Sequence, residues 1–310
     1  MNLVILSKGP GLYSTRRLAQ AAGERGHRVM VRNPLNFTMT VHSRQPEIFY
    51  NRKPLGKVEA VIPRIGASIT FYGLAVVRQF EMMDIPSLNS STSIRRSRDK
   101  LLCFQMLSTH DIGLPATAFA SQTEDVKAAI QSLGGPPVIV KLLQGAQGVG
   151  VMLAESIRSA EAIVDAFQSL NQNILIQEYV RDAKGSDLRA FVIGGRVAAA
   201  CRRWSNARDF RSNLHRGGTA EKVVLPPEFE RTAIEAARIV ELRVAGVDML
   251  ESNRGPLVIE VNSSPGLEGI EAISKVDLAT QVIVEMEKLV EKAREAPHAV
   301  PRHLGSGNLG

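Results

Sequence analysis

The chain has few cysteines, few aromatic residues and no long hydrophobic run, and each scarcity excludes a class of protein. Only Cys103 and Cys201 occur among 310 residues, too few for a disulfide framework and without the spacing of a metal-binding motif. No run approaches the roughly 18 apolar residues of a membrane span. The first residues, MNLVILSKGPG, hold too short an apolar stretch for a signal peptide. We therefore expect a folded cytoplasmic protein with no membrane-spanning segment.

Acidic residues are outnumbered by basic ones, with 31 Asp and Glu against 38 Lys and Arg and a net charge of +7. The excess is concentrated in IRRSRDK (94–100) and in CRRWSNARDFRSNLHR (201–216). Only Trp204 and Phe210 lie among these charges, so a surface that stacks nucleic-acid bases is not expected. A pocket for anionic substrates fits the clustering better, and a solvated basic face is the alternative.

Strand and helix signals alternate over the first ninety or so residues. NLVILS, HRVMVRN and EAVIPRIG have the composition of strands, and helical patterns lie near 15–26 and 72–83. This order predicts a small α/β domain with a parallel sheet over residues 1–96. Gly9 and Gly11 lack the G-x-G-x-x-G spacing, so a dinucleotide fingerprint is not supported.

The sequence after residue 96 predicts two further segments of helices and strands, followed by a tail. One helix is expected over 97–115, with Lys100 in its first turn and glycine and proline at its end. The composition then alternates between strands and helices, which we divide into segments 97–185 and 186–295. The last residues, 296–310, are rich in proline, glycine and polar side chains, which predicts a flexible tail.

Two apolar runs near the C-terminus flank the turn-prone SNRG (252–255) and contain three polar exceptions. A turn centred on Arg254 places Asp248 opposite Glu260, and Asn262 two residues further on points to the same face. Opposed like charges destabilise a sheet unless something compensates them. Two carboxylates and an amide oxygen suit Mg²⁺ or Mn²⁺, as in nucleotide enzymes. The alternative is an ordinary hairpin with a solvated face, but its alternation is poor, so a metal site is favoured.

The segment VIVKLLQGAQGVGVML places Lys141 at the end of a buried strand, before Gly145, Gly148 and Gly150. Glycines let backbone N–H groups approach phosphate oxygens, and a lysine at a strand end pairs with phosphate charge. The Walker A pattern is absent, and a second strand follows the loop, which favours a β-turn-β cover over the phosphates. Taken alone, a glycine-rich hairpin turn is the simpler explanation. Beside a metal site, phosphate binding becomes the better one.

Two further segments carry candidate binding residues. In ILIQEYV the strand ends at Glu178 and Tyr179, where a free strand edge suits an adenine, and Asp187 follows as a candidate for ribose hydroxyls. RDFRSNLHRGG supplies Arg211 and Asn213 before paired glycines, an arrangement that suits a loop around anionic oxygens. The alternatives are ordinary acids at a strand end and a solvated basic loop.

Together these motifs resemble the ATP-grasp carboxylate–amine ligases, and more narrowly the RimK family. The resemblance covers roughly residues 1–290 and is carried by RDKL, VKLLQGAQGVGV, LIQEYV, DFRSNLHRGG, AGVDML and IEVNSSPGLEGIE, together with IPRIG and TFYG. It implies an ATP-grasp fold of the α+β kind, with an N-terminal parallel-sheet domain and two subdomains that clamp the nucleotide. It also implies a ligase that adds L-glutamate to the C-terminal tail of ribosomal protein S6 through an acyl phosphate, releasing ADP and phosphate.

The resemblance further implies a homotetramer without direct nucleic-acid binding, and a role for each candidate residue. Implied contacts are Lys100, Lys141, Gly145, Gly148 and Gly150 with the ATP phosphates, Glu178 and Tyr179 with adenine, Asp187 with ribose, Arg211 and Asn213 with the phosphate and acyl region, and Asp248, Glu260 and Asn262 with one or two Mg²⁺ or Mn²⁺ ions. Lys141 and Arg211 would be catalytic, because they would stabilise developing negative charge.

Two residues depart from the family's pattern in the glycine loop. Ala146 stands where many relatives have a hydroxyl residue, and Gln144 where an acid is common. Loop contacts to phosphate would then depend on backbone N–H groups. Two alternatives are a related ligase with another acceptor, such as an amino-group carrier protein, a peptide or polyglutamate, and a non-catalytic basic protein that binds RNA.

Overall fold

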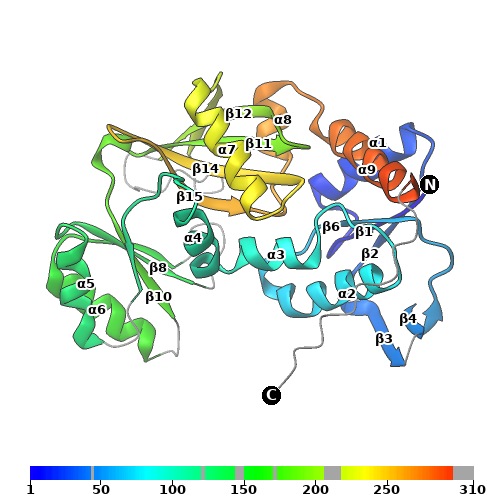
Figure 1. Ribbon diagram of the computed structural model, residues 1–310, viewed down its shortest axis with the longest axis horizontal. Helices are drawn as coiled ribbons and strands as arrows, with labels where there is room; N and C mark the ends of the chain where they lie inside the picture. Colours follow the sequence, from blue (N-terminus) through cyan, green and yellow to red (C-terminus); the bar gives the residue numbers. More distant parts are fainter. Residues whose placement is uncertain (43–44, 120–122, 144–149, 170–172, 206–217, 296–310) are drawn as a thin grey trace, which may run out of the picture.

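Figure 1 shows the computed structural model of the chain. It describes residues 1–310 except 43–44, 120–122, 144–149, 170–172, 206–217 and 296–310. Several predicted features lie outside the described residues: Gln144, Gly145, Ala146, Gly148, Arg211, Asn213 and the tail from residue 296.

The N-terminal region contains the expected parallel sheet. Strands β1 (Asn2–Leu6), β2 (Arg28–Arg32) and β6 (Ala60–Pro63) lie in the order β2-β1-β6, and both pairings are parallel. Helices α1 (Tyr13–Glu24) and α2 (Thr70–Met82) accompany them. The last four residues of β1 are fully buried, as expected of a parallel strand covered on both faces. The prediction of a small parallel α/β layer is confirmed.

A second small sheet in this region was not predicted. Strands β3 (Phe37–His42), β4 (Gln45–Tyr50) and β5 (Lys53–Pro54) form an antiparallel meander after the short η1 (Pro34–Asn36). Its Phe37 ring packs edge-on against the Phe80 ring of α2 at a centroid distance of 5.8 Å. This contact joins the meander to the hydrophobic core of the N-terminal region.

The single helix expected over 97–115 is wrong, because the chain forms two helices there. Helix α3 (Ser91–Arg98) ends at Arg98, and α4 (Lys100–Ser108) begins after the single residue Asp99. Asp99 is extended, with φ −80° and ψ 98°, and its carboxylate accepts a hydrogen bond from the N–H of Leu102 at 3.0 Å. An aspartate N-cap thus starts a new helix inside the expected one.

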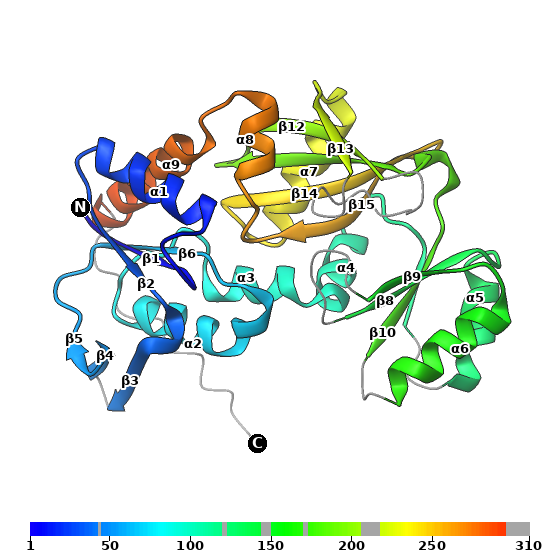
Figure 2. The ribbon, with the colours of Figure 1, turned by 180° about the vertical axis from the view of Figure 1, so that it is seen from behind.

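The central region is an antiparallel sheet in the order β7-β10-β8-β9, with two helices packed on one face. Figure 2 shows α3 and α4 leading from the N-terminal region towards this sheet. Its elements are β7 (Thr117–Ala118), η3 (Thr123–Asp125), α5 (Val126–Ser132), β8 (Val138–Leu142), β9 (Val151–Ala154), α6 (Ile157–Gln168) and β10 (Ile174–Glu178).

The C-terminal region holds a five-stranded antiparallel sheet in the order β13-β12-β11-β14-β15. Helix α7 packs against its strands through a core of small and branched apolar side chains. The elements are η4 (Arg181–Ala183), β11 (Ser186–Ile193), β12 (Arg196–Trp204), β13 (Thr219–Lys222), α7 (Pro227–Ile239), β14 (Val244–Ser252), β15 (Gly255–Asn262), α8 (Glu268–Ser274) and α9 (Leu278–Glu295). The short η2 (Ala67–Ile69) precedes α2.

The last helix returns to the start of the chain, and both ribbon views show α9 beside α1 (Figures 1 and 2). One hydrophobic core therefore contains Leu3 of β1, Phe191 of β11 and Ile283 of α9. In the described part of the chain, no helix is long and apolar enough to cross a membrane.

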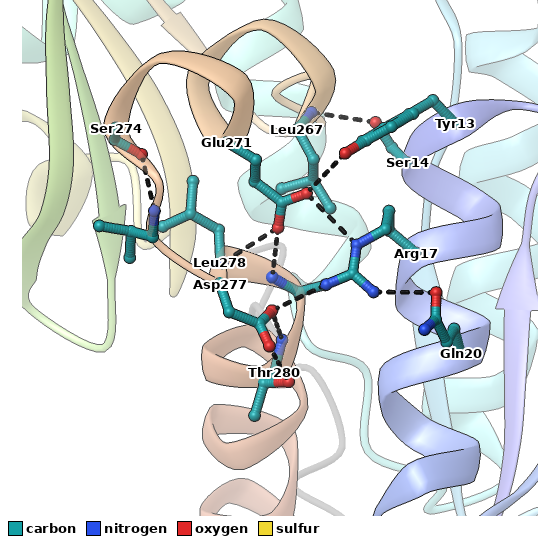
Figure 3. A network of polar contacts seen from close by, with 12 residues as sticks. Tyr13, Ser14, Arg17, Gln20, Leu267, Glu271, Ser274, Asp277, Leu278 and Thr280 are labelled. Atoms are coloured by element: carbon teal, nitrogen blue, oxygen red, sulfur yellow. Dashed lines mark hydrogen bonds and ion pairs between the residues drawn. The ribbon is translucent and has the colours of Figure 1, made fainter. Parts of the chain in front are cut away.

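A buried carboxylate reinforces this junction (Figure 3). Glu271 of α8 accepts hydrogen bonds at 3.0 Å from the N–H groups of Leu278 and Ala279, the first two residues of α9. The same carboxylate accepts a hydrogen bond from Tyr13 at 3.2 Å and lies 3.5 Å from the Nε of Arg17, both on α1. Burial is the largest cause that raises the pKa of Tyr13, and the negative charge of Glu271 raises it further. The N-terminal and C-terminal regions are thus held together beside the end of β15.

Candidate functional site

The predicted opposition of Asp248 and Glu260 is present, but a bulge produces it. The hairpin turns at Asn253 and Arg254, two residues rather than one central residue. That turn alone would place Asp248 opposite residue 259. A one-residue shift in register directly after Asp248 restores the pairing with Glu260. Bulges of this kind are common beside functional sites, where they redirect a side chain.

Asn262 ends the same strand and pairs with Gly246. It lies two residues beyond Glu260, and both residues line one pocket. The amide oxygen of Asn262 accepts a hydrogen bond from the N–H of Ser264 at 2.9 Å, which fixes the side chain and leaves a second lone pair for another contact.

Asp248 belongs to a buried cluster of alternating charge. Its two oxygens accept hydrogen bonds from Nε and Nη2 of Arg189 at 2.7 and 2.6 Å. The Nη2 of Arg203 lies 2.9 Å from its Oδ2. Arg203 also donates two hydrogen bonds of 2.6 Å to Asp187. Burial alone would raise the pKa of Asp248, but Arg189 and Arg203 outweigh it and hold that pKa well below its usual range. The cluster therefore keeps Asp248 ionised, as a metal ligand must be.

Asp187, the candidate for ribose, is one of the four residues of this cluster. Its side chain is buried against Arg203 on the neighbouring strand. Asp187 and Asp248 thus share Arg203 as an ion-pair partner, a connection that was not predicted from the sequence. Its contact with ribose stays a prediction.

Lys141 lies in the middle strand pair of the central sheet, opposite Leu175 and Val151. Its ammonium group donates a hydrogen bond of 2.5 Å to the amide oxygen of Gln177. Burial lowers the pKa of Lys141 to about 8, and the charge of Glu260 partly offsets this effect. The strand therefore holds a lysine with an uncommonly low pKa close to Glu260.

Lys100 begins α4 and reaches the end of β8. Its ammonium group donates hydrogen bonds to the carbonyl of Leu143 at 3.1 Å and to that of Leu142 at 3.5 Å. Burial lowers the pKa of Lys100, and Glu260 again acts in the opposite direction. Two lysines that are distant in the sequence thus both lie within the electrostatic reach of Glu260.

Gly150 closes the turn between β8 and β9 at a φ of +72°. A Cβ atom at this position would lie 2.4 Å from the side chain of Leu142, so only glycine fits. The N–H of Leu142 also donates to the carbonyl of Gly150 at 2.8 Å. Strands β8 and β9, which flank the glycine loop, pair antiparallel as predicted. Residues 144–149 of the loop lie outside the described part of the chain.

The free strand edge expected at Glu178 is wrong, because β10 is an interior strand between β7 and β8. The N–H of Glu178 donates to the carbonyl of Ala116 at 2.9 Å. Its carboxylate accepts a hydrogen bond from the N–H of Ala116 at 2.8 Å and is also paired with Arg254. Free backbone groups for an adenine can begin only at Tyr179. The roles of Glu178 and Tyr179 at the adenine stay predictions.

A pocket of about 880 Å³ lies between the N-terminal region, α3 and α4, and β15. Its lining includes Glu260, Asn262 and Ser263 from β15 and the residue after it, and Arg98 and Lys100 from the helices. The volume is typical of sites for ligands as large as a nucleotide. Within the described ranges, no group of three or more His, Cys, Asp and Glu could hold a metal ion. A metal site here therefore requires the amide of Asn262 beside the two carboxylates.

Arg189 and Arg203 also belong to the site, although they were not predicted as members of it. Both interrupt strands that are mostly apolar, which is the same signal that identified Asp248 and Glu260. Arg98 was noted only as part of a basic segment, although its side chain lines the pocket. A charged residue within an apolar strand was thus a sufficient signal for Arg189 and Arg203. The position of Arg98 at the pocket could be found only from the fold.

Two family models together match nearly the whole described chain. Residues 1–94 match the RimK PreATP-grasp domain, and residues 97–286 match the RimK-like ATP-grasp domain. A protein of Shewanella denitrificans called "Probable alpha-L-glutamate ligase 1" is 54% identical over 294 residues, which is 95% of this chain and 100% of that protein. A protein of Azotobacter vinelandii called "Probable alpha-L-glutamate ligase" is 50% identical over 99% of this chain and 100% of its own length.

Solved structures share the fold at lower identity. The RimK domain protein ATP-grasp from Sphaerobacter thermophilus has a TM-score of 0.71 and 22% identity, covering 93% of this chain and 100% of that one. The ATP-grasp ligase PsnB, solved with a variant of its minimal precursor, Mg and ADP, has a TM-score of 0.69 and 19% identity, covering 92% and 98%. The expected ATP-grasp architecture is confirmed.

Proposed function

Because this chain belongs to the RimK family of ATP-grasp ligases, we propose that it joins L-glutamate to the C-terminal carboxylate of an acidic polypeptide, ribosomal protein S6. Relatives called alpha-L-glutamate ligases, at least 50% identical over nearly the full length, support the choice of glutamate. The observation that carries the proposal is the pairing of Asp248 with Glu260 across the hairpin, beside a pocket that Lys100 also lines. Membership of a ligase family removes the alternative of a non-catalytic RNA-binding protein.

The proposed reaction has two steps, because a carboxylate oxygen is a poor leaving group. First, the acceptor's carboxylate attacks the γ-phosphorus of ATP, and the bond to the ADP oxygen breaks to give an acyl phosphate. Next, the amine of glutamate attacks the acyl carbon, loses a proton, and expels inorganic phosphate to leave an amide bond. Both steps gather negative charge near the phosphate, so positioning and electrostatic stabilisation would supply most of the catalysis.

The chain's own residues would supply that stabilisation. Lys141 and Lys100 would pair with phosphate oxygens, since both lie near the end of β8, where the glycine loop begins. Arg211 and Asn213 would hold the transferred phosphate and the acyl group. Among the residues that the structure describes, no side chain stands out as the base for the amine, and a phosphate oxygen would accept that proton.

Asp248, Glu260 and Asn262 would hold one or two Mg²⁺ or Mn²⁺ ions, and Asp248 would share its oxygens between the metal and its two arginines. Asp248 is kept ionised by its arginines, and Asn262 keeps a lone pair, as described above. In the described part of the chain, Glu260 is exposed and no hydrogen bond or ion pair engages it, so both of its oxygens are available. The metal, when bound, would neutralise charge on the ATP phosphates.

The acceptor is proposed as a flexible acidic tail. The net charge of +7 favours anionic partners. PsnB, which shares the fold, was solved with a variant of its minimal precursor. An amino-group carrier protein, a free peptide or polyglutamate are the alternative acceptors. We further propose that the enzyme acts as a homotetramer in the cytoplasm.

Mass spectrometry tests the proposal directly. Purified enzyme, ATP, Mg²⁺ and L-glutamate are incubated with S6 or with an S6 variant that lacks its C-terminal tail, and each added glutamate gives a fixed mass step. We expect a mass ladder only on the intact tail, and competition among the alternative acceptors ranks them. Absence of any ladder, with ATP left intact, would contradict the glutamate ligase.

A second test concerns Arg211. We expect Arg211→Ala to lose ligation while ATP binding stays measurable, because the proposed contact acts on the transferred phosphate and the acyl group. Unchanged ligation rates in this variant would remove Arg211 from the mechanism.

A further inference from the structure

The wall of the pocket formed by α3 and the end of β15 carries polar atoms that lack partners. Arg98 of α3 and Ser263, the residue after Asn262, both line this pocket. Within the part of the chain that the structure describes, the Nε of Arg98 and the Oγ of Ser263 are buried without a hydrogen-bond partner. Ser263 is only 3% exposed. Buried polar atoms are nearly always paired in native proteins, so these two can hydrogen-bond a bound ligand or water in the pocket.

A second arginine lies directly behind this wall. Arg64 and Ser263 border the same small gap of about 10 Å³ between β6 and the residues after β15. No acidic side chain among the described residues pairs with Arg64. Burial and the neighbouring charge of Arg98 lower the pKa of Arg64 to about 10. The charge of Glu260 acts on Arg98, but in the described part of the chain neither arginine forms an ion pair with a carboxylate, so the two guanidinium groups can bind an anion.

The local fold holds these groups in place before any ligand binds. The Nη2 of Arg98 donates a hydrogen bond of 2.5 Å to the carbonyl of Ile65, next to Arg64. Gly73 of α2 packs so closely on Ile65 that an added Cβ would lie 2.6 Å from that side chain. The motifs IPRIG and TFYG, which have no place in the proposed nucleotide contacts, are therefore the parts that fix this wall.

We propose that Arg98, Arg64 and Ser263 form a subsite for a carboxylate of the glutamyl substrate, either the incoming glutamate or the last residue of the acceptor. This proposal rests on the proposed function. Ser263 directly follows Asn262, so a carboxylate bound here places the rest of the glutamyl group beside the metal ligands. The ligand supplies the acceptor oxygens that Arg98 lacks and separates two like charges.

Enzyme kinetics test the subsite with three variants. Arg98→Gln removes a charge from the pocket wall, and Ser263→Ala removes the unpaired hydroxyl. Arg96→Gln is the matched control, because Arg96 lies on the same helix but pairs with Glu241 and does not line the pocket. The KM values for glutamate, for the acceptor and for ATP are measured separately. Glutamine as donor, and an acceptor that ends in glutamine, are compared as substrates.

We expect Arg98→Gln to raise the KM of glutamate or of the acceptor roughly 10- to 100-fold, as for loss of a charged hydrogen bond. The substrate whose KM rises identifies the source of the carboxylate. The enzyme's preference for glutamate over glutamine in that substrate should fall as well. Ser263→Ala raises the same KM several-fold without lowering the melting temperature, because its hydroxyl has no partner to lose. Arg96→Gln changes neither KM by more than about twofold.

Unchanged KM values for both glutamyl substrates in Ser263→Ala, or a rise for ATP alone, overturn the subsite. Equal rises in all three KM values overturn it as well, because they indicate general distortion. If Arg98→Gln does not fold, the Ser263→Ala result decides. Wild-type enzyme that does not use glutamate contradicts the proposed function itself, whereas an active wild type with unaffected variants contradicts only the subsite.

Discussion

Replacement of Glu260 by alanine is the most direct test of the site. Glu260 is exposed on β15, and in the described part of the chain no hydrogen bond or ion pair holds it. Its removal should lower the free energy of unfolding by no more than about 1 kcal/mol, because the side chain is exposed, although its charge acts on nearby cationic groups. The fold, and with it the shape of the pocket, should survive. Any large effect on turnover then comes from the reaction.

The expected loss of activity follows from the charges around Glu260. The charge of Glu260 partly offsets the lowering of the Lys100 and Lys141 pKa values by burial, so Glu260 lies within electrostatic reach of both lysines. Loss of one metal ligand removes about 3 to 5 kcal/mol of charge stabilisation from the transition state. At 1.36 kcal/mol for each factor of ten, turnover should fall by roughly two to nearly four orders of magnitude.

The assay is glutamate-dependent release of ADP, measured across a range of Mg²⁺ concentrations. Glu260→Gln keeps the shape of the side chain and should be nearly as inactive, because the lost charge is what matters. Glu251→Ala is the control: it removes a glutamate from the neighbouring strand of the same hairpin, where Glu251 pairs with Arg202 instead. That variant should keep turnover within about twofold. Turnover of Glu260→Ala within threefold of wild type would refute the metal assignment.

Three further outcomes are expected. Arg203→Gln should lower the free energy of unfolding by about 3 to 5 kcal/mol in urea, because Asp187 and Asp248 lose their shared buried cation; a loss under about 1 kcal/mol would contradict this. The KM for ATP should rise as the pH increases through about 8, because Lys141 then loses the charge that pairs with phosphate. Lys141→Arg should remove this pH dependence, because arginine stays charged. A wild-type KM for ATP that does not change with pH would count against the contact. Glu271→Gln should cost about 1 to 2 kcal/mol and speed amide hydrogen exchange at the start of α9, where its carboxylate accepts two N–H groups; unchanged exchange there would show that the carboxylate does not hold the junction.

The opposition of Asp248 and Glu260 shows how far local pattern carries a prediction of the site. Two apolar runs around a turn were enough to pair the carboxylates, since strand alternation and a short turn constrain register strongly. The position of the turn was wrong by half a residue, and a bulge compensated for it. Bulges depend on packing against the rest of the sheet, so their place could not be predicted from the hairpin alone.

The sequence by itself determined the class of fold, the parallel N-terminal sheet, most strands and helices, and the family, because each depends on short-range periodicity or on a motif. Only the tertiary structure decided which charges meet. Asp187, Arg203 and Asp248 come from three strands, and Arg98 and Ser263 line one pocket. Such pairings depend on how distant elements pack, and the energy of a buried charge depends on the partners that this packing supplies.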